Sequence, residues 1–393
     1  MTKIKLSAVL LGTVASLAFA GAAQAQTRGV TKTEIVLGSH TDMSGPAAAF
    51  GATSANGMRM RADEINEAGG IHGRKIRLIV EDTQYQVPRA VQAGNKLLKN
   101  DKIFAMVGAL GTPQNNAVLK DQLALNVPNM FPVTAAREMY EPMHRLKFAA
   151  NASYYDQVRS GIKLMVQTKG KKAVCALYQD TDFGEEIHRG AIDQTKAMNI
   201  PLVATATNKP TDSDFTAQIA KLRGANCDLV VMGTIVRDSV VPYITARKMG
   251  WTNVDFMGTS AAYVNFVSNQ PGNAMDGFYT LSGTIFPSRA TAPANLVAWM
   301  DKYKSKFNAE PNVGVAYGYN AMDVVAQGIQ NAGANLTVDT FIAGMEKING
   351  YRDLFNGPTQ SYGPNKRLGA DLSYMFQVKG TEFVPISMDP VGY

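Results

Sequence analysis

Short apolar runs alternate with amphipathic stretches along most of this chain. The apolar runs predict β-strands, and the amphipathic stretches repeat apolar residues at the spacing of a helix. Such alternation predicts βαβ units and therefore parallel sheets. Strands are predicted at residues 34–38, 75–81, 103–107, 129–131, 173–178, 202–207, 228–232 and 255–257, and helices at 52–68, 89–100, 154–169 and 183–198.

The alternation runs through the chain twice. One series ends at about Phe148, and a second begins near Lys171. From about Phe278 the pattern becomes richer in helix, which fits a chain that returns to complete its first domain. This last part has predicted helices at 291–308 and 318–332 and paired strands within 374–386.

The turns after the predicted strands are small, polar and rich in glycine. Ligands of parallel sheets bind at the carboxyl ends of the strands, so a binding site is expected here. Hydroxyl groups and the free N–H groups of the helices that follow would together cradle an anion or a carboxylate. The turns occupy residues 38–46, 108–112, 132–136, 179–184, 233–234 and 258–260.

The composition fits a globular protein and argues against disorder. Of 393 residues, 46% are hydrophobic and 18% charged, and the formal net charge is +7. The positive excess is spread along the chain, and its densest cluster, residues 169–172, is too short for an arm that binds nucleic acid. We therefore expect no nucleic-acid partner and a mildly basic surface.

The first 25 residues have the pattern of a secretory signal peptide. Lys3 and Lys5 precede an apolar run at 6–20 that is too short for a comfortable membrane span. Residues 23–25 form an A-x-A site, which predicts cleavage after Ala25. The mature protein is expected in a bacterial periplasm, without stable membrane insertion.

Two cysteines, Cys175 and Cys227, lie in or beside predicted strands. An oxidising compartment permits a disulfide between them. Neighbouring strand positions often exceed the Cα separation of about 7 Å that a disulfide tolerates, so two buried free thiols are the alternative.

Motifs of catalysis and of cofactor binding are missing. The four histidines (His40, His72, His144 and His188) are scattered and form no metal motif, and no complete glycine-rich nucleotide loop occurs. The turn around Ser260 resembles a nucleophile elbow but lacks its last glycine. We expect no enzyme activity, no cofactor and no metal.

Several segments resemble the leucine/isoleucine/valine-binding protein family, which comprises type I periplasmic solute-binding proteins of ABC transporters. The opening segments of the resemblance are 43–46, 50–51 and 63–76. Further matches lie at 81–83, 107–108, 128–135, 182–184, 212–216 and 256–258.

The resemblance implies an α/β fold with two Rossmann-like lobes, parallel central sheets and a hinge of three crossovers. Lobe 1 would hold residues 27–149 and 281–362, and lobe 2 would hold 150–280 and 363–393. The family also implies a monomer that closes on a small molecule and then docks on an inner-membrane permease.

Site residues follow by position within the matching motifs. Thr112 would bind a ligand carboxylate, and the turn Val133–Thr134–Ala135 would supply the second contact through the Thr134 hydroxyl or the Ala135 N–H. Phe50 and Phe183 would form aromatic walls. Ser260 stands where amino-acid binders place a glutamate that pairs with the ligand ammonium.

The serine changes the expected ligand. A buried ammonium without a charged or well-bonded partner costs several kcal/mol, so we expect an apolar carboxylate such as an aromatic, fatty or dicarboxylic acid. Arg237 could add a second carboxylate anchor, and Arg137 has the same two interpretations, ligand contact or solvated arginine. The alternatives are branched-chain amino acid binding, a sensory receptor of the same fold, and an exported enzyme.

Overall fold

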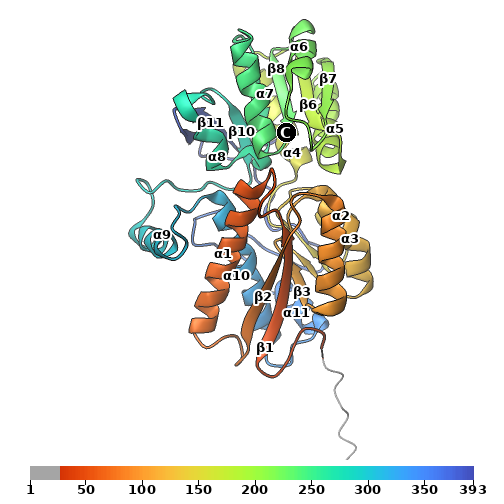
Figure 1. Cartoon of the computed structure of the whole chain (residues 1–393), viewed down its shortest axis with the longest axis vertical. Coiled ribbons are helices and arrows are strands. Elements are labelled where there is room, and N and C mark those ends of the chain that lie inside the picture. The colour runs from red at the N-terminus through yellow and green to blue at the C-terminus, as the bar shows by residue number, and fades with distance from the viewer. Residues whose placement is uncertain (1–26) are drawn as a thin grey trace, which may run out of the picture.

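The computed structural model describes residues 27–393, which form two α/β lobes placed end to end along the molecule (Figure 1). The predicted signal peptide and its cleavage site lie outside the described residues. The predicted fold class is confirmed, and each strand predicted between residues 34 and 257 has a counterpart in the two sheets.

Lobe 1 is built on a five-stranded parallel sheet with the order β2-β1-β3-β4-β5. The first strand pairs with the second from Glu34 and Lys75 to Thr41 and Asp82, and it is buried along most of its length. The strands are β1 (Glu34–Thr41), β2 (Lys75–Asp82), β3 (Ala105–Val107), β4 (Asn129–Met130) and β5 (Lys147–Phe148).

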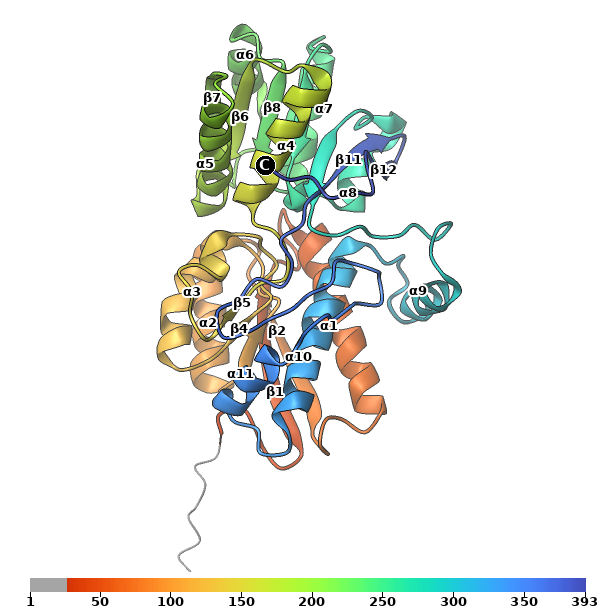
Figure 2. The same cartoon turned by 180° about the vertical axis from the view of Figure 1, so that it is seen from behind.

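Helices α1 and α10, far apart in the sequence, lie side by side on lobe 1 (Figures 1 and 2). Glycine allows this close approach, because a Cβ at Gly57 would overlap the Val315 carbonyl and one at Gly318 the Ser54 carbonyl. The helices of this lobe are α1 (Ala48–Glu67), α2 (Val87–Asn95), α3 (Thr112–Ala124), α9 (Ala294–Phe307), α10 (Val313–Ala332) and α11 (Val338–Glu346), with short turns at η1 (Lys96–Asn100) and η2 (Arg137–Met139).

Lobe 2 is built on a seven-stranded sheet with the order β12-β11-β10-β9-β8-β6-β7. Its first five strands in the sequence are parallel, and the last two join as an antiparallel hairpin at one edge. The strands are β6 (Val174–Gln179), β7 (Leu202–Asn208), β8 (Leu229–Gly233), β9 (Asp255–Gly258), β10 (Tyr279–Ser282), β11 (Tyr374–Lys379) and β12 (Glu382–Pro385). The helices are α4 (Tyr154–Lys169), α5 (Asp182–Ala197), α6 (Thr216–Gly224), α7 (Val236–Lys248) and α8 (Asn265–Ser268), with short turns at η3 (Ser260–Ala262) and η4 (Pro271–Asn273).

The chain crosses between the lobes after β5, after β10 and before β11. The three crossings lie together, because Ala149 bridges to Leu368 and Gly283 has no room for a Cβ beside Asn151. The strand β10 belongs to the sheet of lobe 2 up to Ser282, just past the boundary expected at residue 280. Figure 2 shows the C-terminal segment, in dark blue, returning from lobe 1 to the hairpin of lobe 2.

A disulfide joins Cys175 at the start of β6 to Cys227 ahead of β8, with their Cα atoms 5.9 Å apart. Buried free thiols, the alternative left open by the sequence, are therefore not the form present. The two strands are direct neighbours in the sheet, with Val174 opposite Leu229, and this pairing brings the cysteines within reach.

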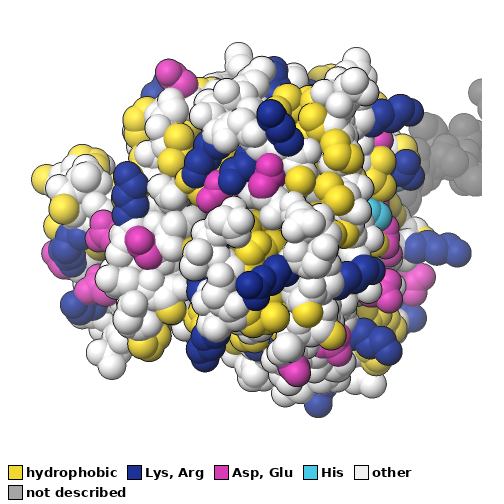
Figure 3. All heavy atoms as spheres, turned by 90° about the horizontal axis from the view of Figure 1, so that it is seen from above, with side chains coloured by type: hydrophobic (Ala, Val, Ile, Leu, Met, Phe, Trp, Pro, Cys, Tyr) yellow, Lys and Arg dark blue, Asp and Glu magenta, His cyan; other side chains and the backbone are white. Residues whose placement is uncertain are grey.

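The charged surface agrees with the spread seen in the sequence. Figure 3, which views the molecule from the lobe 2 end, shows lysine and arginine side chains interspersed with acidic ones. Within residues 27–393, no helix has both the length and the apolar character that crossing a bilayer requires.

Candidate functional site

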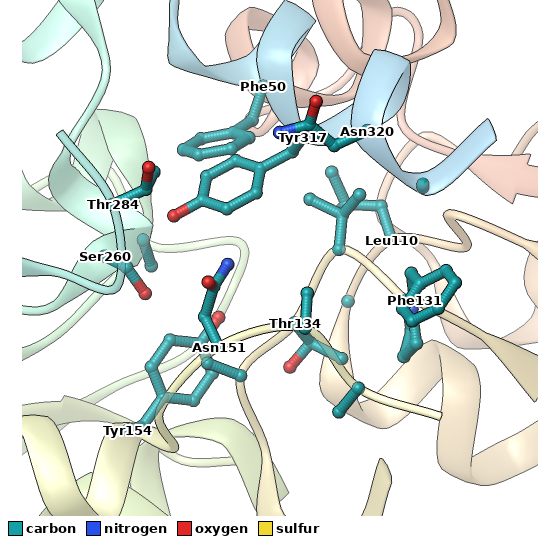
Figure 4. Close-up of a pocket in the computed structure, with 18 of the residues that line it drawn as sticks. Phe50, Leu110, Phe131, Thr134, Asn151, Tyr154, Ser260, Thr284, Tyr317 and Asn320 are labelled. Atoms are coloured by element: carbon teal, nitrogen blue, oxygen red, sulfur yellow. The ribbon is translucent and has the colours of Figure 1, made fainter. Parts of the chain in front are cut away.

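A cavity lies between the two lobes, at the carboxyl ends of the lobe 1 strands (Figure 4). About 100 Å³ of it is open to the centres of water molecules, which is room for on the order of ten water-sized groups. The lining from lobe 1 includes Phe50, Tyr85, Leu110, Thr112, Phe131, Val133, Thr134, Ala135, Tyr317 and Asn320, and the lining from lobe 2 includes Tyr154, Phe183, Ile235, Val236, Ser260 and Ala261.

The structure brings together seven of the eight residues expected at the site. Phe50, Thr112, Val133, Thr134, Ala135, Phe183 and Ser260 all line the cavity, although they come from both lobes. The eighth, Arg237, lies outside the lining.

Thr112 and Thr134 form a hydroxyl pair at the start of α3. Their Oγ1 atoms are 2.7 Å apart, and both side chains are buried. Gly111, just before the helix, has a φ of 96°, which suits glycine and allows the sharp entry. No acidic residue occupies the first turn of α3, so its free N–H groups and partial positive charge face this end of the cavity. The arrangement suits a carboxylate.

Tyr154, at the first position of α4, adds a protonated phenol to this end. Burial raises the pKa of its hydroxyl to about 12, although hydrogen bonds with Ala135 and Thr134 act in the opposite direction. The phenol therefore keeps its proton at neutral pH.

Ser260 lies opposite, in η3 of lobe 2, and is held by Gln157 of α4. Its N–H donates to Gln157 Oε1 at 2.8 Å, and its Oγ accepts from Gln157 Nε2 at 3.1 Å. Because the hydroxyl oxygen is already an acceptor, its proton is free to be donated to a ligand. No carboxylate stands at this position.

Two aromatic pairs form apolar walls. Phe50 stacks on Tyr317 of α10 with ring centroids 5.8 Å apart, and Tyr154 meets Phe183 edge to face at 5.1 Å. Figure 4 shows the first pair across the cavity from Tyr154. The walls favour a ligand with an apolar body.

Several lining residues were missed in the sequence. Tyr85 follows β2, and the rule that sites lie at strand ends could have found it; its backbone is left-handed, with a φ of 58°. The others come from the returning segment, which no local pattern connects to the strand ends. They are Tyr317, Asn320, Asp353, Pro358 and Gln360, together with Asn151 and Thr284 from the crossings.

Asp353 is the only carboxylate among the described lining residues, and none of these is lysine or arginine. Its Oδ1 accepts from the N–H groups of Phe355 and Gly357, and its Oδ2 accepts from Asn320 at 2.5 Å. Burial nevertheless raises the pKa of this carboxyl.

The expectation that Arg237 anchors a carboxylate is wrong, because its guanidinium is used elsewhere. Nε donates to Asp238 at 2.6 Å, and Nη2 donates to the carbonyls of Pro210 and Asp212. Arg137 also lies outside the lining, and its guanidinium carbon lies 3.8 Å from the ring centroid of Tyr155.

Polar contacts beside the cavity join the lobes directly. Glu186 of α5 accepts hydrogen bonds from the Arg137 N–H at 3.1 Å on both carboxylate oxygens. Asn116 of α3 donates to Asp182 of α5 at 2.9 Å. Burial is the largest cause that raises the pKa of Glu186 to about 8. The lobes are therefore in contact around the cavity.

Within residues 27–393, no group of three or more histidine, cysteine, aspartate or glutamate side chains could hold a metal ion.

The comparisons with known proteins agree with this geometry. A sequence model of the family described as periplasmic binding protein matches residues 34–382. The Leu/Ile/Val-binding protein homolog 8 of Brucella suis is 22% identical over 361 residues, covering 88% of this chain and 87% of that protein.

Two solved structures resemble the fold. One is a branched-chain amino acid ABC transporter protein from Thermus thermophilus with bound valine, with a TM-score of 0.83, 17% identity, and coverage of 93% of this chain and 98% of that chain. The other is a fatty acid ABC transporter substrate-binding protein from Thermomonospora curvata, with a TM-score of 0.81, 21% identity, and coverage of 94% and 95%.

Proposed function

Because the chain belongs to the Leu/Ile/Val-binding family of type I periplasmic binding proteins, we propose that it is the receptor of an ABC uptake system for a small apolar carboxylate. The ligand would be an aromatic, fatty or dicarboxylic acid held between the lobes. The observation that carries this proposal is the Thr112–Thr134 hydroxyl pair at the start of α3, facing two aromatic walls.

The carboxylate would bind without a cationic side chain. The hydroxyls of Thr112 and Thr134, the phenol of Tyr154 and the N-terminus of α3 supply donors at one end of the cavity. Hydrogen bonds to a charged acceptor are each worth about 1.5–3 kcal/mol, so a few of them offset the cost of removing the carboxylate from water.

An α-amino acid would also need a partner for its ammonium group. Ser260 offers a hydroxyl that Gln157 holds, not a charge. Asp353 is the acid that favours the alternative, branched-chain amino acid binding, which the names of the relatives also suggest. Its carboxylate is already engaged by Phe355, Gly357 and Asn320, and we therefore rank this alternative second.

Binding would act through closure of the lobes about the three crossings. A ligand that contacts Thr112 on lobe 1 and Ser260 on lobe 2 stabilises the closed form more than the open form. The closed form would then dock on the inner-membrane permease. No chemical change of the ligand is involved.

Calorimetry on refolded, ligand-stripped protein tests the proposal. We expect benzoate, coumarate or octanoate to bind more tightly than leucine, and Thr112→Val to weaken that binding about tenfold or more. Thr168→Val, at an exposed threonine of α4, is the matched control. Tight binding of leucine together with no binding of the acids would reject the proposal.

A further inference from the structure

The cavity extends beyond the carboxylate end into lobe 1, along α10. There its lining is apolar at Phe131, Ala321 and Val324, and it becomes polar again at Asn320 and Gln360. These polar residues lie on α10 and on the returning segment, whereas Thr112 and Thr134 lie at the ends of β3 and β4. The cavity therefore has a second polar group on different elements.

Asn320 is held in one orientation by Asp353. Its Nδ2 donates to Asp353 Oδ2, and a carboxylate accepts but does not donate, so the amide cannot be reversed without losing this bond. Asn320 Oδ1 is buried and has no hydrogen-bond partner among the described residues. An acceptor in that state costs free energy until a donor reaches it.

Gln360 presents the complementary group. Its side chain is almost fully buried, at 4% exposure, and its Oε1 accepts from the Tyr362 hydroxyl at 2.6 Å. That bond leaves the amide nitrogen as the outward donor, and this nitrogen has no partner within residues 27–393. The far end of the cavity thus offers one free acceptor and one free donor.

We infer that Asn320 and Gln360 form a second subsite that recognises a hydroxyl group at the end of the ligand opposite its carboxylate. A hydroxyl donates one hydrogen bond and accepts others, so it satisfies Asn320 Oδ1 and Gln360 Nε2 at once. The inference rests on the proposed function, because it assumes that the carboxylate occupies the Thr112 end. It adds that the ligand is bifunctional, with a hydroxylated apolar body.

Matched ligand pairs test the subsite on the unmodified protein. Calorimetry would compare para-hydroxyphenylpropanoate with phenylpropanoate and with its para-methoxy analogue, and ω-hydroxyoctanoate with octanoate. The two series distinguish an aromatic from an aliphatic body. In at least one series we expect the hydroxylated acid to bind about tenfold or more tightly than its analogues, because the analogues leave buried groups unpaired.

Two variants locate the effect. Gln360→Met and Asn320→Ala should bring the hydroxylated acid close to the affinity of its unhydroxylated analogue, whereas Gln327→Ala, at an exposed glutamine of α10, should preserve the preference. Thermal melting of each variant checks that it folds, and the ligand pairs on the unmodified chain need no variant.

The outcomes separate the two proposals. Equal binding of hydroxylated and unhydroxylated acids would overturn the subsite and leave the carboxylate receptor intact. Binding of neither, together with tight binding of leucine, would overturn both. A preference for the hydroxylated acid that survives in Gln360→Met and Asn320→Ala would also overturn the subsite.

Discussion

At the scale of single residues, Ser260 is the position where side-chain charge has the greatest effect on ligand choice. It lies in lobe 2, and Gln157 fixes both its backbone and its hydroxyl. An acid here would add a negative charge to the cavity, next to the space that we assign to an apolar carboxylate.

Ser260→Glu should therefore weaken binding of the carboxylate by about ten- to a hundredfold, since like charges a few ångströms apart repel by a few kcal/mol at the effective dielectric of a protein. It should raise the affinity for leucine relative to Ser260→Gln, a neutral side chain of the same length. Calorimetry with both ligands measures the two effects. Equal loss of carboxylate binding in the Glu and Gln variants would show that size, and not charge, is responsible.

The residue scale also shows how far the sequence leads. Phe50, Thr112, Thr134, Phe183 and Ser260 follow strand ends or matching motifs, and the fold brings them together. Arg237 was misassigned because the sequence could not show that Asp238 and two carbonyls take up its guanidinium. Tyr317, Asn320, Asp353 and Gln360 were missed because tertiary packing of the returning segment, not local pattern, places them at the cavity.

At the scale of elements, amphipathic helices were predicted well and mixed ones were not. The predicted helix at 154–169 matches α4, and its boundaries coincide with a serine cap and a left-handed glycine. Helix α3 was missed because its buried side includes Gln114, Asn115 and Gln122, which hides the apolar face. Helix α7 was missed for another reason, since Pro242 lies inside it.

The disulfide connects two elements of lobe 2 and should add measurable stability. Its cysteines are 52 residues apart in the sequence, and closing a loop of that length restricts the unfolded chain by about 4 kcal/mol in the chain-entropy model. The double variant Cys175→Ala, Cys227→Ala should lower the free energy of unfolding by about that amount in urea. The unmodified protein under a thiol reductant is the comparison, and an unchanged midpoint in both would contradict the expectation.

At the scale of the whole molecule, the contact between the lobes should make ligand binding depend on pH. Glu186 of lobe 2 faces Arg137, Glu138 and Tyr140 of lobe 1 and the start of α4, and burial raises its pKa from 4.5 to about 8. Closure therefore favours the protonated carboxyl, whereas opening exposes it to water and restores an ordinary pKa.

The sign follows from this difference. Closure takes up a proton between the two pKa values, so affinity should fall as the pH rises from about 5 to 8 and level off above 8. Glu186→Gln should flatten the curve between pH 6 and 8, and calorimetry in buffers of different ionisation enthalpy should detect the lost proton uptake. The same slope in the variant would assign the dependence to another group.

Ownership of the cavity is unequal. Most of its described wall belongs to lobe 1 and the returning segment, and lobe 2 closes it with a few helix starts and one turn. When the halves swing apart, cargo seated as we propose would stay behind on the larger half, like a letter in an opened drawer. Discharge then becomes a second event, governed by how firmly lobe 1 retains its guest after the lid has lifted.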